Sequence, residues 1–359
     1  MNKKIIFSAG GTGGHIFPAI NLMKHFFDKG YDVSLVTDKK GKGFIKNYPS
    51  CKLYILKTGT PTNKNLLLKF LSIFIILYSI IKSIIILKKS KPNLIIGFGG
   101  YVSFPISYAC RFFNIPLVIY EPNLMMGRAN KYLLKYAKKV FLNKTINSNI
   151  LEKFKNKISE VGSILDKNII NYSNFEKDSN KDIFTILVIG GSQGAEIFGK
   201  IIPPVIKMIK DKGYNIQINQ QCTNSQKNFI SDYYKKNNII NYIFEFDKNV
   251  LQLFSTADLA ITRCGASATA ELTHTLTPFV AIPIPDAIDN HQYLNAKFYE
   301  NKGCCWILEQ KNFNTKNLFN LIIEVLKNKN KLKTMQNNMK KIYNNNVYSI
   351  IEKEIENFI

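Results

Sequence analysis

The chain has 359 residues, of which 46% are hydrophobic and 21% charged, and its formal net charge is +24. This length suits two domains, and the apolar share excludes an intrinsically disordered chain. A basic charge of this size is compatible with an anionic partner such as a membrane surface. The sequence contains no RNA- or DNA-binding motif, so we expect no nucleic-acid partner.

Lysine, asparagine and isoleucine are abundant throughout, as an AT-rich coding sequence would produce, and we attribute most of the charge to this bias. The six cysteines form no C-x-x-C motif and no spacing typical of a zinc site. This pattern predicts reduced thiols that fill the core of a cytosolic protein. A strand-like run begins at Lys4, so we expect no signal peptide.

The first half of the chain alternates short apolar runs with helical patterns. Strands separated by helices predict a parallel sheet that is covered on both faces. Right-handed crossovers then place the strand-to-helix turns at residues 10–15, 97–103 and 121–123 on one edge of the sheet. The expected strands are 4–9, 32–37, 52–57, 93–97, 116–120 and 139–142.

The first turn reads GGTGGH at residues 10–15 and joins a strand to a helical pattern. Glycine has no Cβ and accepts positive φ, so this backbone can approach a ligand closely. The helix that follows offers free N–H groups and a partial positive charge, which suit a phosphate group. The alternative is a tight turn that binds nothing, and four glycines beside His15 favour the binding site.

The segment 65–87 is apolar along nearly its whole length, with interruptions at Lys69 and Lys82. Its uninterrupted part is too short to span a bilayer. It is either a crossover helix buried against the sheet, or a helix whose exposed face enters a membrane surface with lysines at the headgroups. The residues alone favour burial.

A second glycine cluster, GFGGYVS at residues 97–103, also joins a strand to a helix. Glu121 and Asn123 follow the next strand, at the sheet edge where ligands bind in parallel folds. For Glu121, a ligand-binding role and a plain surface turn are equally compatible with the sequence.

A polar stretch at residues 172–181 is the expected domain linker. A third glycine turn, GGSQGA at 190–195, then follows a strand, but it lacks the G-x-G-x-x-G order of a dinucleotide site. The last helix either packs on the second domain or returns to the first. The expected strands are 183–189, 215–219, 239–245, 258–262, 278–284 and 303–308, and the expected C-terminal helices are 315–327, 332–343 and 347–358.

Two strand ends in the second half are unusually polar. In RCGASATAEL, residues 263–272, Gly265 permits a turn, Ser267 is expected to cap the next helix, and Glu271 lies on the strand-end side. Glu271 would otherwise only complement the helix dipole. The stretch 283–292 is bounded by prolines and rich in hydrogen-bonding groups, which indicates contact with a polyhydroxylated ligand or, alternatively, a solvated loop.

Taken in order, the motifs GGTGGH, GFGGY, GGSQGA, R-x-G-A at Arg263, Glu271, and D-x-x-Q-x-x-N-A at Asp289 resemble the MurG family of glycosyltransferases. The resemblance covers nearly the whole chain. It implies a GT-B fold, with two doubly wound, Rossmann-like parallel-sheet domains that face each other across a cleft. The domains would be 1–162, facing acceptor and membrane, and 163–344, binding the donor, with the final helix, about 345–359, able to return to the first.

The resemblance implies that UDP-N-acetylglucosamine is the donor and that the second domain binds it. Glu271 would hold the ribose hydroxyls, Gln292 the sugar hydroxyls, and Phe246 would lie near the uracil. The expected donor-binding residues are Ser192, Gln193, Gly194, Phe246, Arg263, Gly265, Ala266, Glu271, His291 and Gln292.

The implied acceptor is lipid I, undecaprenyl-pyrophosphoryl-MurNAc-pentapeptide, which the transfer converts to lipid II of peptidoglycan. His15 is the expected general base, since a neutral imidazole accepts a proton near pH 7, and Glu121 is the alternative. The segment 65–91 takes the position of a patch facing an anionic membrane, on its cytoplasmic side, which reverses the preference for burial. The expected acceptor-binding residues are Thr12, Gly13, Gly14, His15, Gly99, Gly100, Tyr101 and Asn123.

The chain departs from the family pattern in three places. Gly162 is followed by SILD instead of Asn-Pro-x-Arg, so the usual phosphate-site arginine is missing and Lys167 is the candidate substitute. Tyr120 stands where a histidine often occurs, and His291 where a glutamine is common. These departures affect the phosphate site and leave the reaction class unchanged.

The implied reaction is inverting sugar transfer with no cofactor, and the absence of a D-x-D motif predicts no requirement for a metal. One alternative is another GT-B enzyme with a lipid acceptor such as diacylglycerol. The other is a non-catalytic nucleotide-sugar-binding scaffold at the membrane. The motifs at 10–15 and 289–296 argue against the first alternative, and His15, Glu271 and Gln292 argue against the second.

Overall fold

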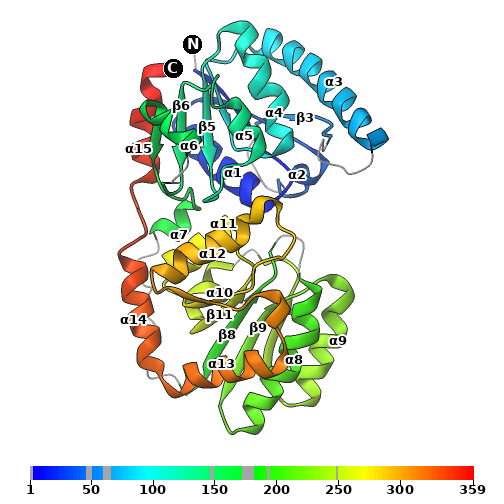
Figure 1. Cartoon of the computed structure of the whole chain (residues 1–359), viewed down its shortest axis with the longest axis vertical. Coiled ribbons are helices and arrows are strands. Elements are labelled where there is room, and N and C mark those ends of the chain that lie inside the picture. Colours follow the sequence, from blue (N-terminus) through cyan, green and yellow to red (C-terminus); the bar gives the residue numbers. More distant parts are fainter. Residues whose placement is uncertain are drawn as a thin grey trace. The chain divides into compact units, whose positions relative to one another are not determined.

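The computed structural model describes residues 3–45, 51–59, 66–145, 149–171, 182–191, 195–247 and 250–359. The chain forms two compact units, Met1–Asp166 with Asn344–Ile359, and Lys167–Tyr343 (Figure 1). Each unit is built around one parallel sheet, which confirms the predicted class of two doubly wound domains.

The sheet of the first unit has the strand order β3-β2-β1-β4-β5-β6-β7, and all neighbouring strands are parallel. The direction of winding reverses between β1 and β4, so the turns that follow these two strands meet at the carboxyl edge. Strand β7 is absent from the expected set because three residues carry no periodic signal. The strands are β1 (Lys4–Ser8), β2 (Asp32–Thr37), β3 (Lys52–Ile55), β4 (Leu94–Gly97), β5 (Leu117–Glu121), β6 (Lys139–Leu142) and β7 (Ile158–Glu160).

Helices cover this sheet, and every residue of β4 and β5 is buried. A strand that is buried on both faces reads as a continuous apolar run, which is why these strands could be predicted. The helical segments are α1 (Gly13–Asp28), α2 (Lys39–Gly43), α3 (Leu66–Ser90), α4 (Gly100–Ala109), α5 (Arg128–Leu133), α6 (Asn149–Glu152) and α15 (Val347–Ile355), with 3-10 turns η1 (Cys110–Phe113), η2 (Lys155–Lys157) and η5 (Glu356–Phe358).

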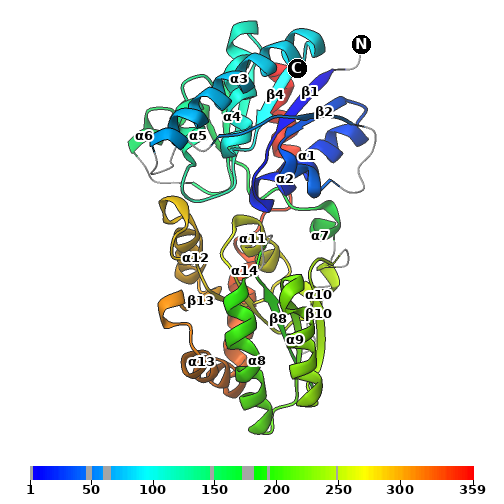
Figure 2. The same ribbon diagram turned by 90° about the vertical axis from the view of Figure 1, so that its right-hand side faces the viewer.

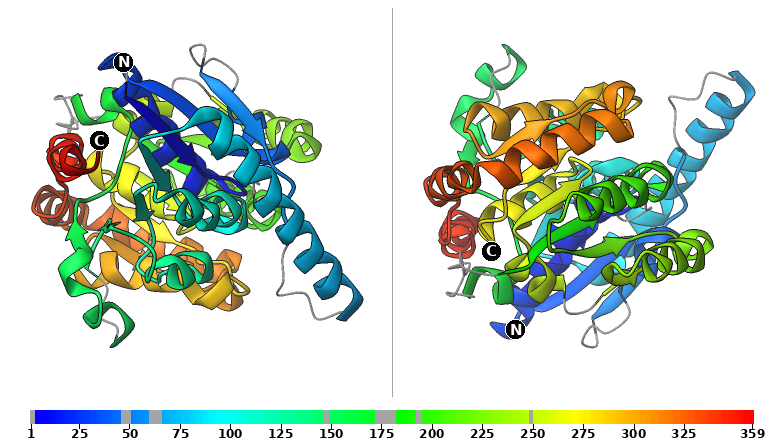
Figure 3. Two further views of the ribbon diagram at one scale, coloured as in Figure 1. Left: turned by 90° about the horizontal axis from the view of Figure 1, so that it is seen from above. Right: turned by 90° about the horizontal axis from the view of Figure 1, so that it is seen from below.

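Helix α3 lies along the outer side of its unit (Figures 2 and 3). Its inward face combines buried serines with apolar side chains such as Leu87. Ser79 and Ser83 are fully buried, and the Ser79 hydroxyl donates to the carbonyl of Lys57. The preference for full burial is therefore wrong, because many of the apolar residues of α3 form an exposed face. We call this face the α3 apolar surface, and it consists of Leu67, Leu68, Phe70, Leu71, Ile73, Phe74, Leu77, Tyr78, Ile81 and Ile85.

In the second unit the strand order is β10-β9-β8-β11-β12-β13, again all parallel. Here the winding reverses between β8 and β11. The strands are β8 (Phe184–Ile189), β9 (Ile216–Gln221), β10 (Ile240–Phe244), β11 (Leu259–Thr262), β12 (Phe279–Ala281) and β13 (Cys305–Ile307). The helical segments are α7 (Lys167–Asn171), α8 (Glu196–Asp211), α9 (Asn224–Lys236), α10 (Val250–Thr256), α11 (Ala266–His274), α12 (His291–Asn301), α13 (Thr315–Lys327) and α14 (Lys329–Lys340), with η3 (Ile288–Asn290) and η4 (Gln310–Asn312).

The C-terminal helix α15 packs on the first unit, which decides between the two placements left open by the sequence. The Tyr348 hydroxyl donates to the carbonyl of Leu165 at 2.5 Å. Glu352 pairs with His25 of α1 at 2.5 Å, and Glu354 pairs with Lys139 of β6 at 2.6 Å. The helix therefore belongs to the first unit by both packing and charge.

Candidate functional site

In the first unit, the GGTGGH turn leads from β1 directly into α1. Gly11 has a φ of +80°, and a Cβ at Gly10 would lie 2.5 Å from Cγ2 of Val102 in α4, so both positions require glycine. Thr12 is the N-cap of α1, and its side chain makes no capping bond and is exposed. Its hydroxyl therefore makes no capping bond to the helix and is accessible to a ligand.

The second glycine turn packs directly against His15. Gly99 and Gly100 have φ of +82° and +77°. A Cβ at Gly99 would lie 3.3 Å from Cε1 of His15, and a Cβ at Gly100 would lie 3.6 Å from Cδ2 of the same ring. The winding reversal between β1 and β4 thus brings together the two turns that the sequence analysis singled out, with the His15 ring at their junction.

The carboxylate of Glu121 closes the loop from β5 to α5. It is fully buried, and four groups donate to it: the backbone and side-chain nitrogens of Asn123, each at 3.1 Å, and Gly127 N and Asn130 Nδ2, each at 2.9 Å. Both oxygens are therefore engaged within the loop. Glu121 therefore stabilises the loop through these four bonds, and this role favours His15 over Glu121 as the general base.

Asn130 joins this loop to the glycine turn, and the sequence analysis gave it no role. A Cβ at Gly99 would lie 3.0 Å from Nδ2 of Asn130, and the side chain is 1% exposed. Its Oδ1 has no hydrogen-bond partner within the part of the chain that the structure describes. The signal in the sequence was a polar residue among the apolar positions of a short helix.

Tyr120, which stands where the resemblance led us to expect a histidine, fixes the segment that leaves the first sheet. Its hydroxyl donates to the carbonyl of Gly162 at 3.1 Å and accepts from the backbone N–H of Ile164 at 3.2 Å. Gly162 has a φ of +97°. The substitution therefore has a structural role at the residues that follow β7.

In the second unit, the glycine turn after β8 begins with Gly190 and Gly191, and Gly191 has a φ of +81°. The predicted donor residues Ser192, Gln193 and Gly194 lie outside the described residues. The N–H of Gly190 donates to Oε1 of Gln221 at 3.0 Å, so the start of this turn is fixed by a side chain at the end of β9.

Arg263, predicted to contact the donor, is buried and braces the loop after β12. Its guanidinium donates to the carbonyls of Ile282 and Pro283 at 3.0 and 3.4 Å and to Oε1 of Gln310 at 2.6 Å. Burial lowers the pKa of the guanidinium. The structure thus shows a supporting role for this residue, and direct contact with the donor stays a prediction.

Gln292 and Asn295 of α12 hold the turn after β11. Oε1 of Gln292 accepts from the N–H groups of Cys264 and Ile284 at 3.2 and 3.1 Å, and Nδ2 of Asn295 donates to the carbonyl of Cys264 at 3.1 Å. Because the carbonyl oxygen of Gln292 is held by the backbone, its NH₂ group is the end directed away from these bonds. That end can donate to ligand oxygens.

Helix α11 follows this turn and carries Glu271. Its N-cap is Gly265, without a side-chain capping bond, so the expected capping by Ser267 is wrong: Ser267 is the second residue inside the helix. Ala266 opens the helix, and a Cβ at Gly265 would meet open space. Glu271 lies in the second turn and is half-buried.

The other predicted donor residues lie on separate loops of the second unit. Phe246 follows β10 with 70% of its surface exposed, and His291 opens α12. The residue before it, Asn290, has a φ of +55°, and Asp289 has +52°, which are unusual for residues with a Cβ. Lys167, the candidate phosphate ligand, opens α7 and is half-buried.

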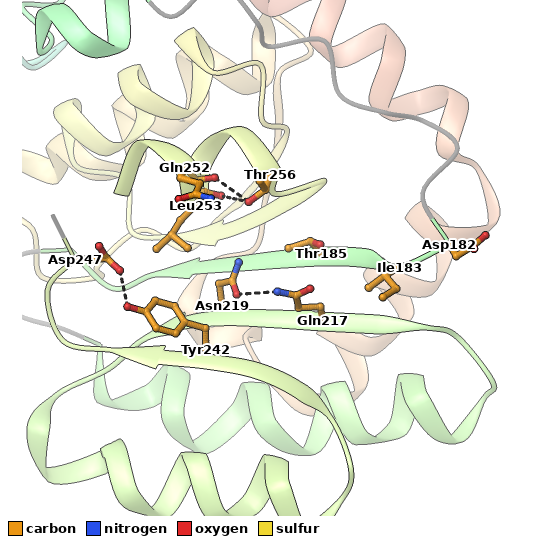
Figure 4. Close-up of a pocket in the computed structure, with 10 residues that line it drawn as sticks. All are labelled: Asp182, Ile183, Thr185, Gln217, Asn219, Tyr242, Asp247, Gln252, Leu253 and Thr256. Atoms are coloured by element: carbon orange, nitrogen blue, oxygen red, sulfur yellow. Dashed lines mark hydrogen bonds between the residues drawn. The ribbon is translucent and has the colours of Figure 1, made fainter. Parts of the chain in front are cut away.

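A cavity of about 710 Å³ lies between α10 and the β8–β9–β10 part of the second sheet (Figure 4). None of the predicted donor residues lines it, so it carries no part of the functional argument. Its lining is formed by Asp182, Ile183, Thr185, Gln217, Asn219, Tyr242, Asp247, Gln252, Leu253 and Thr256.

Comparison with known proteins identifies both units. The model of the glycosyltransferase family 28 N-terminal domain matches residues 5–142, and that of the family 28 C-terminal domain matches residues 185–353. Two relatives bear the name UDP-N-acetylglucosamine–N-acetylmuramyl-(pentapeptide) pyrophosphoryl-undecaprenol N-acetylglucosamine transferase. The one from Pelagibacter ubique is 38% identical over 99% of this chain and 98% of its own length. The one from Rickettsia canadensis is 37% identical over 94% and 95%.

A solved structure agrees with these relatives. The crystal structure of Acinetobacter baumannii MurG superposes with a TM-score of 0.78 at 25% identity and covers 99% of this chain and 100% of that one. The similarity in sequence and in fold therefore extends over the whole chain.

Proposed function

The chain belongs to glycosyltransferase family 28, and we infer that it is an N-acetylglucosaminyltransferase acting on N-acetylmuramyl-(pentapeptide) pyrophosphoryl-undecaprenol. The observation that carries this conclusion is the 38% identity to such a transferase over 99% of the chain. The reaction moves N-acetylglucosamine from UDP-N-acetylglucosamine to the C4 hydroxyl of the muramyl sugar, which converts lipid I to lipid II in peptidoglycan synthesis.

The donor binds the second unit, at the carboxyl edge where the winding reverses between β8 and β11. Support comes from the glycine turn at Gly190, the half-buried carboxylate of Glu271 and the NH₂ group of Gln292, which lie on elements that follow neighbouring strands. Charge-assisted bonds from ribose hydroxyls to Glu271 and donation from Gln292 to sugar oxygens provide polar recognition. Arg263 stabilises this site indirectly, because it holds the loop after β12 through hydrogen bonds to backbone carbonyls.

The acceptor diphosphate binds the first unit, at the N-terminal turn of α1 beside Gly99 and Gly100. Free N–H groups and the helix dipole there favour an anion. His15 takes the proton of the C4 hydroxyl while the oxygen of that hydroxyl bonds to the anomeric carbon of the donor sugar. The bond from that carbon to the phosphate oxygen breaks, UDP leaves with the electron pair, and the configuration inverts.

The enzyme acts at the membrane through the α3 apolar surface, on the cytoplasmic face. Support comes from Phe74 and Ile81, which are 68% and 58% exposed, and from lysines that flank them, including Lys69 and Lys82. A helix with exposed large apolar residues and basic residues at its margins binds anionic lipid surfaces. Within the described residues, Leu67–Ser90 is long and apolar enough to cross a membrane, but the buried Ser79 and Ser83 tie it to the domain and favour surface contact.

The test is release of UDP from UDP-N-acetylglucosamine with lipid I as acceptor, measured beside diacylglycerol. Release with lipid I and none with diacylglycerol is the expected result. Release with diacylglycerol alone would assign the chain to another lipid glycosyltransferase. Binding of the donor without turnover on either acceptor would identify a scaffold.

A further inference from the structure

Gln221 connects two loops of the donor unit through both ends of its amide. It is the last residue of β9, the strand between β8 and β10. Its Oε1 accepts from the N–H of Gly190 after β8, and its Nε2 donates to the carbonyl of Glu245 after β10, both at 3.0 Å. One uncharged side chain thus satisfies a donor on one loop and an acceptor on the other.

The described residues 245–247, which follow β10, are held at two points and present an aromatic ring. The carbonyl of Phe244 accepts from Cys222 N at 2.9 Å, and the hydroxyl of Tyr242 donates to Oδ2 of Asp247 at 2.6 Å. Between these anchors Phe246 is 70% exposed. A phenyl ring held in solvent by a restrained loop is a stacking surface for a flat ring such as a nucleobase.

We propose that Gln221 is a positioning residue for the nucleoside diphosphate: it sets the spacing between the turn at Gly190 and the loop that carries Phe246. The inference rests on the proposed function, because it takes the donor to span these two loops with its diphosphate and its base. Gln221 touches neither group itself. Its loss lets the two loops move independently, so the nucleotide binds more weakly, while the chemistry at the sugar is unchanged once the donor is bound.

Three variants separate this role from general stabilisation of the sheet. Gln221→Ala removes both bonds, and Gln221→Glu keeps an acceptor for Gly190 N but cannot donate to Glu245. The matched control is Gln217→Ala, on the same strand. Within the described residues, the hydrogen bond of the Gln217 amide is to Oδ1 of Asn219 in its own strand, at 3.4 Å, so it connects no loops. The readouts are the Kd for UDP by calorimetry, the donor KM, kcat at saturating donor, and thermal unfolding followed by fluorescence of Trp306, the single tryptophan, in the same unit.

Gln221→Glu, which loses one bond, should raise the Kd for UDP and the donor KM by about tenfold, the value of roughly one net hydrogen bond, and Gln221→Ala, which loses both bonds, should raise them at least as much. Their kcat should stay within about twofold of the parent, and Gln217→Ala should match the parent in all readouts. Parent-like UDP affinity in Gln221→Ala would overturn the proposal, as would an equal loss in Gln217→Ala. UDP binding is measured without acceptor, so a parent enzyme that binds UDP but transfers no sugar would refute the proposed function and leave the role of Gln221 testable.

Discussion

Glu121→Gln distinguishes a carboxylate that closes a loop from one that takes a proton. In the structure Oε1 accepts two bonds from Asn123, and Oε2 accepts one each from Gly127 N and Asn130 Nδ2. Glutamine keeps one oxygen, so its NH₂ group must face two donors whichever way the amide is turned. Each buried donor left unpaired costs about 1–3 kcal/mol, and after relaxation of the loop we expect a loss of about 3 kcal/mol in the stability of the loop.

The assay is hydrogen exchange of peptides that cover residues 117–133, together with chemical unfolding. A loss of about 3 kcal/mol should speed exchange in this segment by about a hundredfold. Fluorescence of Trp306 reports the second unit, so its unfolding transition should not move and serves as an internal control. Glu152→Gln, at a carboxylate that is 73% exposed, is the matched control and should leave exchange unchanged.

The opposite pattern would refute this reasoning. Unchanged exchange and unfolding in Glu121→Gln, together with a kcat lowered by about 10²–10⁴-fold and loss of the acidic limb of the pH–rate profile, would identify Glu121 as the base and not as a residue that closes the loop.

Four further variants test the remaining assignments. His15→Ala should lower kcat by about 10²–10⁴-fold with UDP affinity unchanged, and near-parent turnover in steady-state kinetics would remove it as the base. Glu271→Ala should weaken donor binding by about 1.5–3 kcal/mol in calorimetry, and parent-like affinity would count against the ribose contact. The double variant Lys69→Glu, Lys82→Glu should lose binding to anionic vesicles in sedimentation assays, and unchanged binding would exclude the lysines from the membrane contact. Burial lowers the pKa of His274 below its ordinary value near 6.5, although hydrogen bonds to the backbone of α7 oppose the shift. The unfolded chain therefore takes up a proton first as pH falls through about 6.5, so stability that is present above that pH is lost below it. In unfolding followed by Trp306 fluorescence, His274→Phe should flatten the dependence of the free energy of unfolding on pH, and an unchanged slope would contradict the linkage.

The strands and glycine turns could be predicted because their physical causes are local. A strand buried on both faces needs a continuous apolar run, as in β4 and β5, and a turn with φ near +80° needs glycine, as at Gly99. The right-handed crossover rule then places the turns on one edge, without saying which turns touch. The contact of His15 with the turn at Gly99 required the strand order, in which β4 lies beside β1.

Residues that act through distant hydrogen bonds could not be predicted. The resemblance implies a ligand contact for Arg263, but the carbonyls that it binds come 19 and 20 residues later. Gln221 bridges groups 31 residues before it and 24 after it, and no periodic pattern encodes such a bridge. The orientation of helix α3 has the same cause: composition marks the helix as apolar, and only the packing of Ser79, Ser83 and Leu87 shows which face is turned inward.

The amide of Gln292 shows how such bonds can define specificity as well as structure. Its oxygen accepts from two backbone N–H groups, so rotating the amide by 180° would set its NH₂ group against those same donors. The unfavourable contact of like groups holds one orientation, in which the NH₂ group and not the carbonyl oxygen is left for other partners. The residue is therefore matched to oxygens that accept, such as the hydroxyls of a sugar. Replacing Gln292 by glutamate would keep the two backbone bonds and remove the donors, which separates the role of this side chain in holding the loop from the donor-binding role proposed for it.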